Sequence, residues 1–215
     1  MTAAVFFDLD GTLADTAPDL AGALNALLKR HGKPTVAYEK VRNLAAYGAQ
    51  RLLREGFSIT ADDPGYAALR DEYLNLYGES VCQHSTLFPG IAEVLETLNQ
   101  RQIPWGVVTN KHARFTLPLL EKLGLSQHLA CTISGDSCAN AKPHPEPLLL
   151  AARTLNVDPR DSLFVGDTIN DLKAADAAGM RVLIAGWGYF DENEPRSNWN
   201  PTAWIDTPEE ILAYL

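Results

Sequence analysis

Short apolar segments alternate with helical patterns along most of this chain, and this alternation limits the possible folds more than any other feature. Five segments are apolar and bounded by polar residues or glycine, as expected of strands buried on both faces of a sheet. They are residues 3–7, 105–109, 131–134, 162–165 and 181–185. Amphipathic helical patterns lie between them at 89–100, 113–124 and 145–156. The alternation predicts an α/β fold, in which helices cover a parallel sheet.

One long stretch departs from this alternation. Between about residues 15 and 85 only helical patterns occur, and the last of them places five apolar or aromatic side chains on one face. These are Tyr66, Leu69, Tyr73, Leu76 and Tyr77. We therefore predict a helical module inserted directly after the first strand, with domain boundaries of 1–14 and 88–215 for the core and 15–87 for the insert. The segment 186–206, which contains three tryptophans, is expected to be a loop.

Composition narrows the classes of partner. A chain of 215 residues that is 46% hydrophobic is long enough for one core with a smaller insert. Its net charge of −9 argues against nucleic acid or an anionic membrane as a general partner. The N-terminus lacks the pattern of a signal peptide. The three cysteines of the chain do not have the spacing of metal ligands. Reduced thiols in the cytoplasm are the expectation, while the oligomeric state stays open.

Polar residues follow three of the predicted strands at the points where those strands end. The motifs are DLDGT at 8–12, VVTNK at 107–111 and GDTIND at 166–171, and a fourth polar motif, AKPHPEP, contains Lys142. Because the carboxyl ends of parallel strands share one edge of the sheet, we expect these motifs to meet there. Each motif alone is typical of a helix cap or a turn. Their conjunction favours a binding or catalytic site.

The first of these motifs carries two carboxylates close together. Asp8 and Asp10 are two residues apart, so they share a face of an extended strand, and Gly11 lets the backbone turn after them. Two like charges in one place need a cation or a proton. A calcium-binding EF-hand does not fit, because residues 8–19 lack a third oxygen ligand before the glycine and a glutamate at the end.

In their order and spacing, the four motifs resemble those of the haloacid dehalogenase superfamily of phosphotransferases, and the match covers the whole chain. The insert resembles the cap domain of its phosphoglycolate phosphatase-like and β-phosphoglucomutase-like branch. The resemblance implies a Rossmann-like parallel sheet core with an inserted all-helical cap domain. The segments HSTLFPG, WGVVTNKHARF and the terminal NW are similar to bacterial N-acetylmuramic acid 6-phosphate phosphatases. A small phosphorylated metabolite, N-acetylmuramic acid 6-phosphate or alternatively 2-phosphoglycolate, is the implied substrate.

The residues of the motifs suggest a two-step phosphatase chemistry. Asp8 would attack phosphorus and form an aspartyl-phosphate, and Asp10 would act as general acid and then as general base. Thr109 would hydrogen-bond phosphate oxygens, and Lys142 would neutralise charge. The resemblance assigns a metal to Asp8, the backbone carbonyl of Asp10 and Asp167. Magnesium fits such a set of oxygen ligands.

The remaining candidates support these groups or face the substrate. Supporting roles are expected for Gly11, Thr12, Gly166 and Asp171. Substrate binding is expected for Asn110 and for Arg51 in the cap.

Three other functions would use a related site. A phosphomutase would share the core but would have to retain its phosphoryl group, and a non-catalytic phospho-ligand-binding module would be supported by the loss of a motif residue. A dehalogenase would have no need of Asp10 as an acid.

Overall fold

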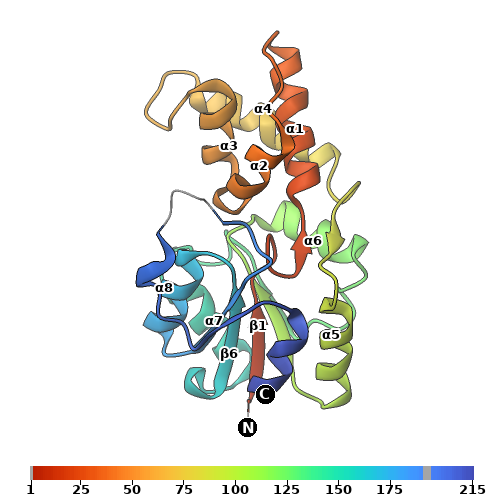
Figure 1. The fold of residues 1–215 in the computed structure, drawn as a ribbon, viewed down its shortest axis with the longest axis vertical. Helices are drawn as coiled ribbons and strands as arrows, with labels where there is room; N and C mark the ends of the chain where they lie inside the picture. Colours follow the sequence, from red (N-terminus) through yellow and green to blue (C-terminus); the bar gives the residue numbers. More distant parts are fainter. Residues whose placement is uncertain (1, 191–194) are drawn as a thin grey trace.

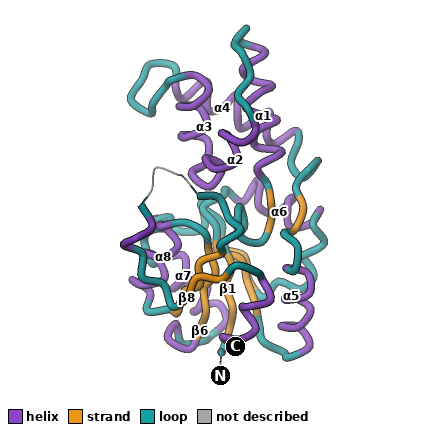
Figure 2. The backbone as a smooth tube through the Cα atoms, viewed as in Figure 1, coloured by secondary structure: helices purple, strands orange, loops and turns teal. Residues whose placement is uncertain are grey.

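The centre of the computed structural model, which describes residues 2–190 and 195–215, is a six-stranded parallel sheet (Figures 1 and 2). The strand order is β5–β4–β1–β6–β7–β8. The strands are β1 (Ala4–Phe7), β4 (Trp105–Val108), β5 (Cys131–Ile133), β6 (Ser162–Gly166), β7 (Arg181–Ala185) and β8 (Ala203–Ile205). All five predicted strands are therefore confirmed, with ends that differ by one residue at most.

The sixth strand, β8, was missed, because the sequence predicted a loop for the whole of 186–206. It has three residues and pairs only with β7, so it is an edge strand. Its Trp204 is exposed and stacks on Trp199. So short a segment shows no alternation long enough to be recognised. The loop prediction for residues 191–194 falls outside the described residues.

Helices cover both faces of the sheet, because the side chains of each strand point alternately to one face and the other. In β1, Val5 and Phe7 join one hydrophobic cluster, and Ala4 and Phe6 join the other. The first face is covered by α5 (Ile91–Gln100), α6 (Ala113–Lys122) and the 3₁₀ segment η4 (Pro208–Tyr214). The second face is covered by α7 (Glu146–Leu155) and α8 (Ile169–Ala178). Short 3₁₀ turns occur at η2 (Pro159–Asp161) and η3 (Arg196–Asn198).

Four further helices lie together beyond the carboxyl edge of the sheet, at the top of Figure 1. They are α1 (Ala17–Arg30), α2 (Tyr38–Leu44), α3 (Gly48–Phe57) and α4 (Tyr66–Glu79), with η1 (Ala45–Tyr47) between α2 and α3. Leu24, Leu53 and Tyr73 are among the side chains they bury against one another. The predicted fold class, a Rossmann-like parallel sheet core with an inserted all-helical cap, is confirmed. No described helix combines the length and apolar character that a membrane span requires.

The two connections between the core and the four helices run side by side. A two-stranded antiparallel ribbon joins β2 (Ala14–Asp15) to β3 (Thr86–Leu87). Near the ribbon, the buried Asp19 of α1 accepts hydrogen bonds from the backbone N–H groups of His84 and Ser85, at 2.9 and 3.0 Å. Both connections thus lie directly above the ends of the central strands.

Candidate active site

A cavity of about 640 Å³ lies between the carboxyl edge of the sheet and the four helices above it. From the sheet edge it is lined by Asp8, Asp10, Thr109, Asn110, Lys111, Lys142 and Asp171. From the helices above, it is lined by Gly48, Arg51, Arg54, Tyr66, Arg70 and Tyr77, among others. The motifs predicted to meet at this edge do so. The base of the cavity combines acidic groups with lysines, whereas three arginines line the opposite wall.

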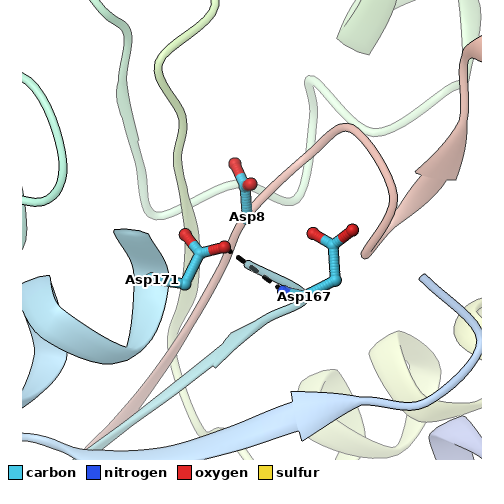
Figure 3. A group of neighbouring side chains, drawn as sticks. All are labelled: Asp8, Asp167 and Asp171. Carbon is cyan, nitrogen blue, oxygen red and sulfur yellow. Dashed lines mark hydrogen bonds between the residues drawn. The ribbon is translucent and has the colours of Figure 1, made fainter. Parts of the chain in front are cut away.

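Three aspartates form a compact cluster at the carboxyl edge of the sheet (Figure 3). Asp8 follows β1, Asp167 follows β6, and Asp171 lies in the first turn of α8. All three are buried, and one carboxylate oxygen from each lies within 4.8 Å of the others. Such a set of oxygen atoms is typical of sites for hard divalent cations.

Asp8 has one buried oxygen atom whose neighbour is the ammonium group of Lys142. Its Oδ1 is buried and accepts no hydrogen bond of good geometry from the described residues, although Lys142 Nζ lies 2.9 Å away. Burial raises the pKa of Asp8 from its ordinary 3.8 to about 6, with Lys142 opposing the change and Asp171 adding to it. Burial, followed by the proximity of Asp171 and Asp8, also raises the pKa of Asp167 well above its usual range. The cluster is therefore short of positive charge.

The other two aspartates differ in how many hydrogen bonds they already accept. Asp167 accepts one bond at each oxygen, from the Thr12 hydroxyl at 3.1 Å and from the Tyr189 backbone N–H at 2.8 Å. Asp171 accepts from Lys142 at one oxygen and from the Thr168 hydroxyl and backbone at the other. A carboxylate oxygen has two lone pairs, so Asp167 keeps free acceptor capacity. This pattern favours Asp8 and Asp167 as magnesium ligands and Asp171 as their support.

Two glycines let the backbone approach these carboxylates closely. Gly11 has a φ of +83°, and a Cβ there would lie 2.2 Å from Asp167 Oδ2. A Cβ on Gly166 would lie 2.5 Å from the Asp171 side chain. Any larger residue at either position would push a carboxylate aside. This is a physical reason for the supporting roles predicted for both glycines.

Lys142 lies between two carboxylates. Its Nζ donates to Asp171 Oδ1 at 2.7 Å and to the Val108 carbonyl at 2.9 Å, and it contacts Asp8. Burial alone would lower the pKa of Lys142, but Asp171 and Asp8 outweigh it and raise the pKa to about 12. The lysine is therefore a fixed positive charge, although only 2% of its side chain is exposed.

Asn110 and Thr109 lie beside this lysine. The Asn110 amide donates to the Lys142 carbonyl at 2.8 Å and accepts from the Lys142 N–H at 2.9 Å. The Asn110 side chain thus holds the lysine backbone, while its prediction as a substrate-binding residue stays a prediction. The Thr109 hydroxyl accepts from the Lys111 N–H at 3.2 Å and lines the cavity, as its expected contact with phosphate requires.

Asp10 is held by partners that the sequence did not indicate. Lys111 Nζ donates to both of its carboxylate oxygens, and the Thr16 hydroxyl donates to one of them. Arg51, the predicted cap residue, lies on α3 with its guanidinium 5.0 Å from the centre of the Tyr47 ring, and it lines the cavity. Arg54 and Arg70 also line the cavity and were not singled out from the sequence.

Tyr189 is a further residue that the sequence analysis missed. Its backbone N–H bonds Asp167, and its buried hydroxyl donates to Asp15 Oδ1 at 2.6 Å. The same hydroxyl accepts from the N–H groups of Thr16 and Ala17, where α1 begins. Tyr189 follows β7 at the same edge as the motifs, and this position is the signal that could have found it. It joins the carboxylate cluster to the first connection into the cap.

Replacing Tyr189 by phenylalanine is expected to lower the free energy of unfolding by about 2–3 kcal/mol, because two buried N–H groups and a carboxylate oxygen lose their partner. Urea denaturation would measure the change. Tyr66→Phe, at a half-buried tyrosine of the cap, is the matched control and should change the free energy by less than about 0.5 kcal/mol. Equal stability of Tyr189→Phe and the wild type would contradict the role given to the hydroxyl.

Comparisons with known proteins agree with this geometry. Residues 5–185 match a protein family described as haloacid dehalogenase-like hydrolase. The chain is 40% identical over 208 residues to N-acetylmuramic acid 6-phosphate phosphatase of Pseudomonas putida. The matched region covers 97% of this chain and 93% of that protein. It is 36% identical to phosphoglycolate phosphatase of Xanthomonas campestris, over 97% of this chain and 94% of that protein. The crystal structure of a predicted phosphoglycolate phosphatase from Haemophilus somnus superposes with a TM-score of 0.88 at 31% identity, covering 99% of this chain and 97% of that one.

Proposed function

The chain belongs to the haloacid dehalogenase-like hydrolase family, and from that premise we propose that it is a magnesium-dependent phosphatase acting on N-acetylmuramic acid 6-phosphate. One observation carries the proposal: Asp8 and Asp171 of a buried aspartate cluster line the base of a cavity, and arginines line its opposite wall. A phosphate ester would place its phosphoryl group at the base and its leaving group beneath the cap.

Asp8 and Asp10 would carry out the two bond-breaking steps. A carboxylate oxygen of Asp8 attacks phosphorus, the bond between phosphorus and the sugar oxygen breaks, and that oxygen takes a proton from Asp10. Water then attacks the aspartyl-phosphate and gives a proton to Asp10, which releases inorganic phosphate and restores Asp8. Dividing the reaction in this way replaces one very slow displacement by two easier ones.

The surrounding groups would supply electrostatic stabilisation. Lys142, already 2.9 Å from Asp8, offsets negative charge on the nucleophile and on the phosphoryl group. The Thr109 hydroxyl would bond a phosphate oxygen. Mg²⁺, held by Asp8, Asp167 and the Asp10 carbonyl with Asp171 in support, would neutralise the carboxylates so that an anionic ester can approach. The closeness of the three buried carboxylates and the free acceptor capacity of Asp167 support this assignment.

The cap would select the substrate. The sheet edge offers contacts for a phosphoryl group, so discrimination must come from residues above it. We place the cap at 15–87, with 1–14 and 88–215 as the core, because the β2–β3 ribbon lies at these boundaries. A cavity of about 640 Å³ suits a phosphorylated amino sugar better than the much smaller 2-phosphoglycolate. Arg51 would bind the lactyl carboxylate of the sugar.

Partners and location follow from the same proposal. The partner we expect is a small phosphorylated metabolite, not nucleic acid or a membrane. Cys82, Cys131 and Cys138 are all free thiols, which is typical of a reducing compartment. The cytoplasm is therefore the location that we expect.

Side-by-side assays should give a kcat/KM for N-acetylmuramic acid 6-phosphate at least tenfold higher than for 2-phosphoglycolate, a preference of roughly 1.4 kcal/mol in the transition state. The physical reason is that the sugar fills the cavity and its carboxylate reaches the cationic wall, whereas the small acid cannot span it. The assay should measure released inorganic phosphate. A tenfold preference for 2-phosphoglycolate would make that compound the substrate, and isomerisation without phosphate release would indicate a phosphomutase.

A further inference from the structure

We infer that Lys111 is a positioning residue, which holds the Asp10 carboxylate in place for proton transfer to the leaving group and is itself covered by Tyr77 of the cap. The inference rests on the proposed function, because it assigns Asp10 the role of general acid. It adds a role for the residue that follows Asn110 in the second motif. It also provides a physical link between the cap and the acid.

The contact between Lys111 and Asp10 is close and well shielded from water. Lys111 Nζ lies 2.9 Å from Asp10 Oδ1 and 3.0 Å from Oδ2. Only 6% of the lysine side chain and 17% of the aspartate side chain are exposed. An ion pair that is shielded in this way is weakened much less by solvent than one at the surface. Lys111 therefore restricts the rotation of the Asp10 carboxylate.

The two oxygens of Asp10 are held differently. Oδ1 accepts two bonds, from Lys111 and from the Thr16 hydroxyl at 2.5 Å. Oδ2 accepts from Lys111 alone. A carboxylate oxygen has two lone pairs, so both of those on Oδ1 are occupied while one on Oδ2 is free. Oδ2 is thus the oxygen that can take up the proton, while Oδ1 remains anchored by both partners.

This arrangement suits both steps of the reaction. In the first step the proton on Oδ2 passes to the oxygen leaving phosphorus, and Lys111 stabilises the resulting negative charge of the carboxylate. In the second step the free lone pair of Oδ2 receives a proton from the attacking water. Throughout, Lys111 and Thr16 keep Oδ1 in one place. The structure shows the carboxylate in the doubly bonded state.

Tyr77 connects this arrangement to the cap. It lies on α4, and the centre of its ring is 4.7 Å from Lys111 Nζ, as in a cation–π contact. Phe115 of α6 packs edge-on against the same ring, 5.2 Å from centre to centre. The Tyr77 hydroxyl is buried and makes no hydrogen bond of good geometry with the described residues, although Tyr77 lies close enough to Lys111 to help raise the pKa of the lysine. The contact with Lys111 that the geometry shows is that of the ring face.

Charge on Lys111 persists in this enclosed position. Burial alone would lower its pKa, but the proximity of Asp10 and of Tyr77 outweighs burial and raises it. The cap thus places an aromatic face over a permanently charged lysine of the core. If the cap moved away, this lysine would lose its cover, and Asp10 would be less firmly oriented.

The test compares two leaving groups of similar size. Phenoxide is a poor leaving group that needs a proton donor, whereas 4-nitrophenoxide leaves readily without one. For Lys111→Met we expect kcat/KM to fall at least tenfold more with phenyl phosphate than with p-nitrophenyl phosphate. Neither compound has a carboxylate, so direct binding of a substrate carboxylate by Lys111 cannot produce this result. Lys173→Met, at an exposed lysine of α8, is the matched control.

A second pair of variants separates the ring from the hydroxyl and serves also if Lys111→Met does not fold. Tyr77→Phe keeps the ring over Lys111, so the ratio of the two kcat/KM values should stay within twofold of wild type. Tyr77→Leu removes the ring and should shift the ratio in the same direction as Lys111→Met. Equal losses for both esters in Lys111→Met, or in Tyr77→Leu, would overturn the inference. Failure of the wild-type protein to release phosphate from any phosphomonoester would instead overturn the proposed function.

Discussion

Replacing Asp8 by asparagine is expected to lower phosphatase turnover by about 10⁴-fold or more, because the amide removes the negative charge of the nucleophile and keeps its volume. Lys142, Thr109 and the rest of the cavity stay in place, so substrate can still bind. The loss should therefore appear in kcat. Phosphate release from N-acetylmuramic acid 6-phosphate would measure it.

The same variant should remain folded. Burial raises the pKa of Asp8 to about 6, so holding the ionised form that predominates at neutral pH costs free energy in the metal-free protein. An uncharged amide avoids this penalty, and Lys142 keeps Asp171 as its partner. Thermal unfolding of metal-free Asp8→Asn should thus occur at or above the wild-type temperature. Asp62→Asn, at an exposed position, is the control and should keep full activity.

The covalent intermediate offers an independent readout for Asp8. Acid quenching of the wild-type enzyme during turnover, followed by mass spectrometry of peptides, should detect one phosphoryl group on the peptide that contains residue 8. The Asp8→Asn protein should carry none. Substantial turnover by the purified variant, with contaminating phosphatase excluded, would contradict an aspartyl-phosphate mechanism.

The residues at the centre of the site could be predicted from the sequence because short local patterns identify them. Asp8, Thr109 and Asp167 each lie directly after a strand, and parallel strands bring their carboxyl ends to one edge whatever the details of packing. The strands themselves are continuous apolar runs, which are recognisable without knowing their neighbours. Fold class and the meeting of the motifs were therefore accessible.

The contacts that hold the site together were not accessible in this way. Asn110 bonds the backbone of Lys142, and the Tyr189 hydroxyl bonds Thr16 across 173 residues of sequence. Such contacts depend on side-chain direction and on how loops pack, which no local pattern encodes. β8 was not predicted for a related reason, since its three residues form a strand by pairing with β7 and not through an alternation of apolar and polar residues. The same limit applies to the cap, whose helices were predicted but whose cavity-lining arginines could not be ranked.

Removal of the metal is expected to have the second largest effect. Exhaustive chelation should lower turnover at least ~10³-fold, and added Mg²⁺ should restore it, because the aspartate cluster would otherwise repel an anionic ester. Ca²⁺ should restore little, since it is larger and takes more ligands at longer distances. Titration of the chelated protein with each ion, followed by the phosphate-release assay, would check this. Full turnover after chelation would exclude the role given to Asp167.

Metal binding should also be visible without any substrate, in the stability of the protein and in its dependence on pH. A ligand that binds only the folded state, at a concentration of about a hundred times its Kd, stabilises that state by about 2.7 kcal/mol. Mg²⁺ should therefore raise the free energy of unfolding at pH 7. The folded-state pKa of Asp8, about 6, lies above its unfolded value of 3.8. Its contribution to metal-free stability is therefore complete below pH 3.8 and lost as the pH rises through 6, a change of about 3 kcal/mol.

The consequence is a stabilisation by Mg²⁺ that depends on pH in a defined direction. Below about pH 6 a proton competes with the cation for Asp8, so the increase in unfolding free energy caused by Mg²⁺ should shrink between pH 7 and pH 5. Asp167→Asn should reduce this increase at pH 7, while Asp62→Asn should leave it intact. Urea denaturation at the two pH values, with and without Mg²⁺, measures all of these differences. An identical effect of Mg²⁺ at pH 5 and pH 7 would mean that the cation binds elsewhere, because a cation held by Asp8 must displace the proton that this buried carboxylate carries in acid.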